Sequence, residues 1–221
     1  VFFVGDFEEG MAHGSGIIYD ENNIRNYQGE MRADKIHGKG KSFDEEGKLE
    51  FEGQFIADQR QGKGVLYKDE KKIFIGYFVN NKKDGEGTLF NEDEQKIYHG
   101  QWRDDCYHGK GTSYYMSGEK HCEGLFESGQ FISGKKYFED GSAIEGDFIN
   151  DVPSGMRVRE YDEKEQLIYI GPYKEGARHG AGLLFQGKEQ IPCMHDNGIL
   201  QTKKDEKKKD EKKKEDEQTA S

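Results

Sequence analysis

A short alternation of aromatic and polar residues recurs along this chain. Its clearest copy runs from Tyr98 to Trp102, where a ring, a polar residue, a glycine, a polar residue and a second ring follow one another. Side chains in a β-strand point alternately to two faces, so this order puts both rings and the glycine on one face. The pattern therefore predicts a strand that buries one face and exposes the other.

The central glycine of this pattern recurs eight times, at intervals of 22 to 25 residues. The eight positions are Gly5, Gly29, Gly53, Gly76, Gly100, Gly124, Gly146 and Gly171. Most of them have a ring two residues before and another ring or a large apolar side chain two residues after. A period of this length is typical of repeat architectures, in which each unit packs against its neighbours.

A second strand follows each central glycine. Nine residues later most copies carry a glycine with a partner two positions on, as in Gly109 and Gly111. Fourteen residues after the central glycine comes a third aromatic residue: Tyr19, Phe43, Tyr67, Phe90, Tyr114, Phe138 or Phe185. Charged turns such as residues 44–47 separate the copies. Because a lone hairpin is marginally stable in water, we expect about eight hairpins to stack into one elongated all-β sheet.

The combined pattern resembles the MORN repeat (membrane occupation and recognition nexus). The resemblance covers residues 1–185 and is best at Tyr98–Gly111, which reads as the family's ring, glycine, ring and His-Gly-x-Gly signature. It implies a single-sheet solenoid of stacked hairpins. Trp102 takes the position of a core ring in the fifth copy.

Two copies depart from the pattern. The sixth has Cys122 in place of a ring, with Ser133 and Lys135 at the expected glycines; the seventh has Ile144, Arg157 and Glu160 at a ring, a glycine and the third aromatic. Larger side chains at glycine positions predict a local change of twist near residues 122–160. Whether this is a bend, a docking point or a tolerated substitution stays open.

The composition changes towards both ends. Residues 1–185 form the predicted array, 186–200 a C-terminal cap and 201–221 a tail rich in Lys, Asp and Glu, expected to be disordered or a solvated helix. The first strand opens on the apolar side chains Val1, Phe2 and Phe3. We expect either preceding sequence or a partner protein to cover this edge, which makes these three residues candidate partner contacts.

Two aromatic residues interrupt an otherwise varied position seven residues after the central glycine. They are Tyr107 and Phe131, and the pattern predicts that both lie in hairpin loops. An aromatic side chain on a polar loop can anchor a partner protein, so both are candidate contacts. Local packing is the alternative.

Charge and cysteine usage narrow the class of partner. The net charge is −11, which disfavours binding to nucleic acid and to anionic lipid. With 14 Phe, 12 Tyr and one Trp, the chain has enough rings for a core although only 32% of it is hydrophobic. Its three scattered cysteines favour free thiols in a reducing compartment. We find no signal peptide and no apolar run of membrane-spanning length.

Candidate chemistry is sparse. His13, His37, His108 and His179 precede a Gly-x-Gly and are good metal ligands by type, but other copies carry Gln61, Asp84 or Ser154 there. A hydrogen-bonding role in the turn explains this position better. The carboxylates lie in solvated turns, and no phosphate-binding loop or nucleophile elbow occurs. We expect no enzyme activity, no cofactor and no bound metal.

The resemblance implies a structural scaffold that mediates protein–protein interactions. Several MORN proteins are parts of cytoskeletal assemblies, including the radial spoke head of the ciliary axoneme. We therefore expect a cytoplasmic, cytoskeleton-associated protein, with the cilium or flagellum axoneme as one site, whose partners are other protein subunits; homo-oligomerisation stays open. The alternative is a membrane or phosphoinositide-binding adaptor. Lysines are frequent in the predicted hairpin loops, which would allow a local basic edge; they are Lys35, Lys39, Lys63, Lys82, Lys83 and Lys110.

Overall fold

The computed structural model describes residues 1–201, and the predicted charged tail lies outside this range from residue 202 on. The described residues form nineteen β-strands and no helix, so the predicted all-β class is confirmed. They divide into two compact units, which meet between Gln130 and Phe131. This boundary falls within the segment where the glycine pattern weakens.

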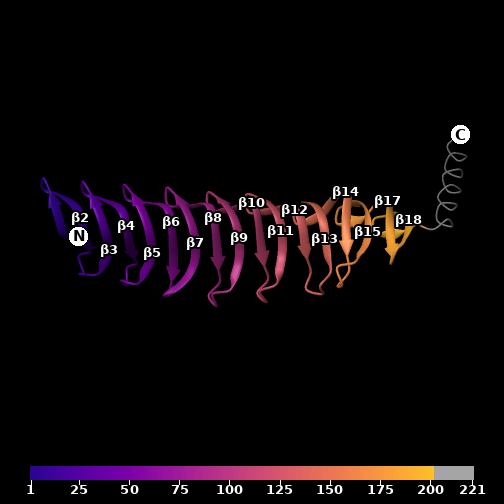
Figure 1. Cartoon of the computed structure of the whole chain (residues 1–221), viewed down its shortest axis with the longest axis horizontal. Helices are drawn as coiled ribbons and strands as arrows, with labels where there is room; N and C mark the ends of the chain where they lie inside the picture. Colours follow the sequence, from indigo (N-terminus) through magenta and orange to yellow (C-terminus); the bar gives the residue numbers. More distant parts are fainter. Residues whose placement is uncertain (202–221) are drawn as a thin grey trace, which may run out of the picture. The chain divides into compact units, whose positions relative to one another are not determined.

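The first unit is an open antiparallel sheet whose strands follow the sequence order (Figure 1). Its strands are β1 (Phe2–Glu8), β2 (Met11–Tyr19), β3 (Arg25–Arg32), β4 (Lys35–Phe43), β5 (Leu49–Ile56), β6 (Gln59–Lys68), β7 (Lys71–Val79), β8 (Lys82–Phe90), β9 (Lys96–Arg103), β10 (Cys106–Tyr114) and β11 (Lys120–Glu127). Every strand pairs with its neighbours in sequence, which is the stacked-hairpin arrangement that the period predicts.

The hairpins close through turns of two residues. In the turn Ala33–Asp34 both residues have positive φ, 49° and 63°, and Asn80–Asn81 is similar at 49° and 71°. Such primed turns match the right-handed twist of the paired strands. The strands consequently extend further towards the turn than the sequence pattern suggests, and few residues are left for a loop.

The second turn residue also ties each hairpin to the preceding one. Asp34 Oδ1 accepts a hydrogen bond from Ala12 N at 2.7 Å, and Asp58 Oδ1 accepts one from Ile36 N at 2.8 Å. In the next two hairpins along the chain, Asn81 Oδ1 and Asp105 Oδ1 accept the equivalent bonds from Arg60 N and Lys83 N of the hairpin before their own. A side chain in the turn therefore satisfies a backbone donor 21 or 22 residues earlier.

The turns between hairpins share another device at the opposite end of the strands. Asp44 Oδ1 accepts hydrogen bonds from Glu46 N at 3.0 Å and from Lys48 N at 2.8 Å. Asp20, Asn91 and Asp162 make the same pair of bonds. These side chains stabilise the turn locally, as Asx turns do.

The core of the first unit is a ring lying across two glycines. Phe51 covers Gly53 of its own strand and Gly64 of the next, and these glycines face each other in the ladder. A Cβ on either glycine would come closer to the ring than 3 Å. The same arrangement holds for Phe3, Tyr27, Phe74 and Tyr98 with their own glycine pairs. The repeating glycines thus provide the space that the buried rings occupy.

The rings also touch one another in a continuous row. From Tyr27 to Phe126, successive rings meet edge to face with centroids 5.1–5.5 Å apart. Such pairs add about 0.5–1.5 kcal/mol each beyond their buried area. Phe51, Phe74 and Tyr98 are fully buried, although the sheet has one layer. The row therefore supplies a core without a second layer of secondary structure.

The second unit repeats this plan with altered register. Its strands are β12 (Gln130–Tyr137), β13 (Ala143–Ile149), β14 (Val152–Tyr161), β15 (Leu167–Lys174), β16 (Ala177–Arg178), β17 (Gly180–Gln186), β18 (Glu189–Asp196) and β19 (Ile199–Leu200). Residues 189–200, predicted as part of a cap, extend the sheet as strands β18 and β19.

The sixth copy keeps its second glycine, contrary to the sequence interpretation. Gly134 opposes Gly146 in the β12–β13 ladder, so Gly134, not Lys135, takes that position. Tyr137, not Phe138, then takes the place of the third aromatic, and Phe138 lies in the following turn. The spacing of 22 residues to the next central glycine, against 24 in most copies, includes this shortening by one residue.

The seventh copy has one residue too many. A bulge between Gly155 and Val158 moves the register, so that Val158 opposes Gly171. Val158 is 1% exposed and replaces the missing glycine by filling the core itself. Tyr161, not Glu160, is consequently the third aromatic, and Glu160 lies opposite Tyr169.

Replacing Gly64 with alanine tests the role of the glycine pair. The added methyl group overlaps the ring of Phe51, so we expect the first unit to lose about 1–3 kcal/mol of unfolding free energy. Urea unfolding followed by Trp102 fluorescence measures the change. Gly118→Asn is the control, because a Cβ at Gly118 meets nothing within 4 Å and Asn tolerates its positive φ. Equal stability of Gly64→Ala and the wild type would contradict the packing account.

Candidate interaction surface

The face opposite the rings is polar, and its side chains support the strands beneath them. Glu30 Oε1 accepts a hydrogen bond from Lys39 N at 3.0 Å, and Gln101 Oε1 accepts one from Lys110 N at 3.2 Å. Each of these side chains lies over a glycine with positive φ, such as Gly38 at 63°. The polar residue after the central glycine therefore stabilises the bulge in the adjacent strand.

An open groove of about 840 Å³ crosses strands β3 to β6 on this polar face. We call it the basic groove. Its lining includes the cations Arg25, Lys39, Lys41 and Lys63, the carboxylate of Glu52, and the apolar residues Phe43, Leu49 and Val65. The central glycines of these strands also line it.

A second groove of about 720 Å³ lies over strands β8 to β11. Its charged residues are Asp84, Glu86, Arg103, Lys110 and Glu123, and His99, His108 and Leu125 also line it. The residue between the two glycines of Gly-x-Gly is Glu86 in one copy here but lysine in the copies of the basic groove. The residue between these two glycines therefore sets the local charge of the polar face. It is also the sequence signal from which the two grooves could have been located.

Tyr107 and Phe131 do not lie in hairpin loops, which corrects the expectation from the sequence. Tyr107 is half-buried in β10 and Phe131 is 3% exposed in β12. The turns take only two residues, so the position seven residues after the central glycine belongs to a strand and faces the rings. Both side chains pack locally, which was the alternative reading.

In other copies, the residue seven positions after the central glycine covers the row of rings with a cationic side chain. Arg60 lies over Phe51 and Phe78, with its guanidinium carbon 5.6 and 5.9 Å from the ring centroids. Lys83 Nζ lies 5.0 Å from the ring centroid of Trp102. Cation–π contacts of this kind let a charged side chain complete an aromatic core.

Tyr107 makes the closest ring contact in the first unit. Its ring stacks on Tyr98 with centroids 3.8 Å apart and an angle of 10°. Burial raises the pKa of Tyr107, and burial together with the neighbouring Tyr107 raises that of Tyr98. Trp102 lies in the same cluster at 4% exposure, and its indole Nε1 donates a hydrogen bond to Gly87 O at 3.2 Å.

The three candidate contacts of the first strand have different environments. Phe3 covers Gly5 and Gly16 as a core ring does, whereas Phe2 is 47% exposed and stacks on Tyr19 at 5.1 Å. Val1 is 88% exposed. Phe3 therefore has a packing role, and only Val1 and Phe2 present apolar area to a partner.

A partly buried polar cluster replaces part of the ring row in the second unit. Arg178 donates to Glu160 through Nε at 2.6 Å and through Nη2 at 2.5 Å, and the Tyr173 hydroxyl donates to Glu160 as well. The hydrogen bonds with Glu160 raise the pKa of Arg178, while burial raises that of Tyr173. Glu160 was read as a lost aromatic residue, but its function is to pair with Arg178.

His195 adjoins this cluster and is 4% exposed. Its ring meets Tyr169 edge to face at 5.6 Å, and its Nδ1 has no hydrogen-bond partner within residues 1–201. Burial lowers the pKa of His195, and the nearby positive charge of Arg178 lowers it further, while Glu160 acts in the opposite direction. Burial and Arg178 therefore both favour the neutral form of the imidazole.

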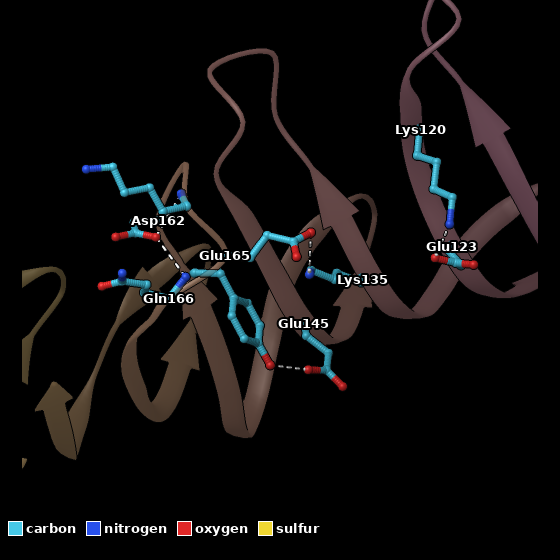
Figure 2. A network of polar contacts seen from close by, with 9 residues as sticks. Lys120, Glu123, Lys135, Glu145, Asp162, Glu165 and Gln166 are labelled. Carbon is cyan, nitrogen blue, oxygen red and sulfur yellow. Dashed lines mark hydrogen bonds and ion pairs between the residues drawn. The ribbon is translucent and has the colours of Figure 1, made fainter. Parts of the chain in front are cut away.

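The polar face of the second unit carries a smaller network (Figure 2). Figure 2 shows Glu165 directed at Lys135, whose Nζ lies 4.0 Å from Glu165 Oε1 and 4.6 Å from the ring centroid of Tyr161. The Tyr161 hydroxyl donates to Glu145 Oε2 at 2.6 Å. Burial, followed by this hydrogen bond, raises the pKa of Tyr161 to about 12.

The histidines before Gly-x-Gly do not converge into a metal site. His13 Nδ1 lies 3.2 Å from Glu8, and His179 Nδ1 lies 3.7 Å from Asp196. The part of the chain that the structure describes contains no group of three or more His, Cys, Asp or Glu suited to a metal ion. Cys106 and Cys193 are free thiols, and Cys122 is buried.

No helix of sufficient length and hydrophobicity to cross a membrane occurs within residues 1–201.

Comparison with known families agrees with the observed hairpins. The family model described as MORN repeat matches five segments of the first unit: residues 3–25, 27–43, 51–70, 74–93 and 98–120. Each segment begins at or near the ring that covers a glycine pair. A search of curated proteins found no match.

Substitution of Tyr107 separates packing from partner binding. We expect Tyr107→Ala to lower the unfolding free energy of the first unit by about 2–3 kcal/mol, because its ring stacks on Tyr98. Tyr107→Phe keeps the stacked ring and should stay within about 0.5 kcal/mol of the wild type. Urea unfolding monitored by Trp102 fluorescence measures both. A wild-type stability for Tyr107→Ala would show that the ring is not part of the core.

The buried neutral His195 predicts a pH dependence of the second unit. Its folded pKa lies below the unfolded value of about 6.5, so the unfolded chain binds more protons as the pH falls through that window. Stability is therefore present above the unfolded pKa and is lost on acidification. Hydrogen exchange of β15 and β17 amides, corrected for intrinsic rates, should show this loss between about pH 7 and pH 5.

His195→Gln removes the titrating group and should remove most of that slope. His108→Gln in the first unit is the matched control and should leave it unchanged. An unaltered slope in His195→Gln would assign the acid sensitivity to other groups.

Proposed function

Because five of its segments are MORN repeats, the chain is a MORN-repeat protein, and we propose that it is a non-catalytic structural scaffold for protein–protein interactions in a cytoskeletal assembly. MORN repeats are generally associated with scaffolds for protein or membrane interaction. The proposal places the protein in the cytoplasm, attached to the cytoskeleton. Its partners are other protein subunits.

The open polar face of the first unit is the observation that carries this proposal. From Tyr27 to Phe126 the rings are buried, and side chains such as Arg60, Lys83 and Tyr107 complete this core, so that part of the ring face has little apolar area left to offer. The polar face has two grooves of several hundred Å³, and no other element of the first unit covers it. A one-layer sheet with such a face provides a large area for docking and little enclosed volume for chemistry.

The ciliary axoneme is the assembly that we propose first, with the radial spoke head as the specific location. This choice follows from the resemblance to MORN scaffolds. The second candidate, a membrane or phosphoinositide-binding adaptor, is supported by the lysines on the polar face, Lys39, Lys63 and Lys110, which lie in strands and not in loops as the sequence suggested.

Site-specific photo-crosslinking in a native ciliary extract tests the scaffold. A crosslinking amino acid at Gln54 or Glu86 on the polar face should capture discrete protein subunits, whereas one at Glu45, in a turn between hairpins, should capture few. Failure of both polar-face positions to capture protein would contradict the scaffold. Co-sedimentation with phosphoinositide vesicles at ~0.15 M salt, performed in parallel, would then identify the adaptor alternative.

A further inference from the structure

The basic groove has a charge opposite to that of the whole chain. Four cationic side chains and one carboxylate line it, which leaves an excess of three positive charges in a protein of net charge −11. The contributors come from neighbouring hairpins: Arg25 from β3, Lys39 and Lys41 from β4, and Lys63 from β6. The positive field is therefore local to this part of the polar face.

Two of the four cations already have internal partners. Lys41 Nζ lies 3.2 Å from Glu52 Oε1, and Arg25 donates to Gln28 Oε1 at 3.0 Å while its guanidinium lies 4.0 Å over the ring of Phe43. Lys39 and Lys63 are exposed, and the structure records no ion pair for either among residues 1–201. These two ammonium groups are the ones available to an external anion.

This charge is not a general property of the fold. The groove over β8 to β11 has three carboxylates against Arg103 and Lys110, because Glu86 occupies the position that Lys39 and Lys63 take in their copies. The chain thus carries one basic and one slightly acidic groove on the same sheet face. A partner can distinguish the two by charge alone.

The shape of the basic groove limits the size of its ligand. It crosses four strands, a distance of roughly 14 Å at about 4.8 Å per strand, which corresponds to four or five extended residues. Phe43, Leu49 and Val65 provide apolar contact beside the lysines. The flanking turns carry carboxylates, among them Glu45, Glu46, Asp69 and Glu70, which would repel a long polyanion or a flat anionic surface.

We infer that the basic groove binds a short acidic segment of a partner protein. Carboxylates of that segment pair with Lys39 and Lys63, and an apolar side chain of the segment packs against Val65 and Phe43. The inference rests on the proposed scaffold function and names the chemistry of one of its partners. Electrostatic complementarity of this kind gives selectivity and fast association.

Fluorescence anisotropy with a fluorescein-labelled hexapeptide of alternating Glu and Leu tests the inference at ~0.15 M salt. The wild type should bind this peptide and should not bind the same design with Lys in place of Glu. Lys39→Glu with Lys63→Glu should weaken binding at least about tenfold, because both side chains are exposed and change sign. Lys72→Glu with Lys96→Glu makes the same change of net charge outside the grooves and should alter binding by less than about twofold.

Equal loss in both double variants, or no binding of the acidic peptide by the wild type, would overturn the inference. Vesicles containing phosphatidylserine or phosphoinositide are the second arm. If the wild type binds vesicles but not the peptide, and the Lys39/Lys63 variant loses vesicle binding, the groove is a lipid site. That result would also overturn the inference.

The photo-crosslinking experiment distinguishes a failure of the groove assignment from a failure of the scaffold proposal. If the Lys39/Lys63 variant still captures every subunit that the wild type captures, the groove assignment fails while the scaffold stands. If the wild type captures no subunit, the scaffold itself fails, whatever the peptide result.

Discussion

The structure depends on a steric complementarity between one ring and two glycines. A ring such as Phe51 can lie flat on its own sheet only where neither its strand nor the next has a Cβ beneath it. Gly53 and Gly64 meet that condition together because they are opposite each other in the ladder. The ring then excludes water from backbone that a single-layer sheet would otherwise expose. Hydrophobic burial is achieved by folding side chains back onto the strands that carry them.

The same constraint explains how the seventh copy keeps the architecture although it lacks the second glycine. Where the second glycine is absent, Val158 enters the core in its place, and a bulge provides the residue needed to align it with Gly171. Beside Val158, a pair of charged side chains takes the place of a ring, because Glu160 holds the guanidinium of Arg178 over the ring of Tyr169. Partial burial of an ion pair costs desolvation, which the three hydrogen bonds to Glu160 offset here. The second unit thus retains the architecture with different chemistry.

Period and alternation were sufficient to predict the hairpins, the buried rings and the polar opposite face. They could not give the register of the sixth and seventh copies, because a spacing of 22 or 25 residues does not say where a residue is lost or gained. They also misplaced Tyr107 and Phe131, since the two-residue turns that extend the strands need positive φ at residues such as Ala33, which the residue type does not indicate. The sequence predicted a local basic edge of lysines in the hairpin loops, and not a groove formed by lysines within the strands. Their convergence requires the cross-strand neighbours of β4 and β6, which lie in different hairpins.

The turn side chains have an implication for how such a chain can change length. Asp34, Asp58, Asn81 and Asp105 each bond to the hairpin before their own, at separations of 21 or 22 residues. Removing or duplicating one entire hairpin would place an equivalent acceptor, an Asp or Asn side-chain oxygen, opposite an equivalent backbone N–H. Inserting a single residue into a turn would instead misalign the two groups. In the first unit, the number of modules can therefore vary by whole steps at little energetic cost, and the reach of the molecule can be adjusted without redesigning any contact.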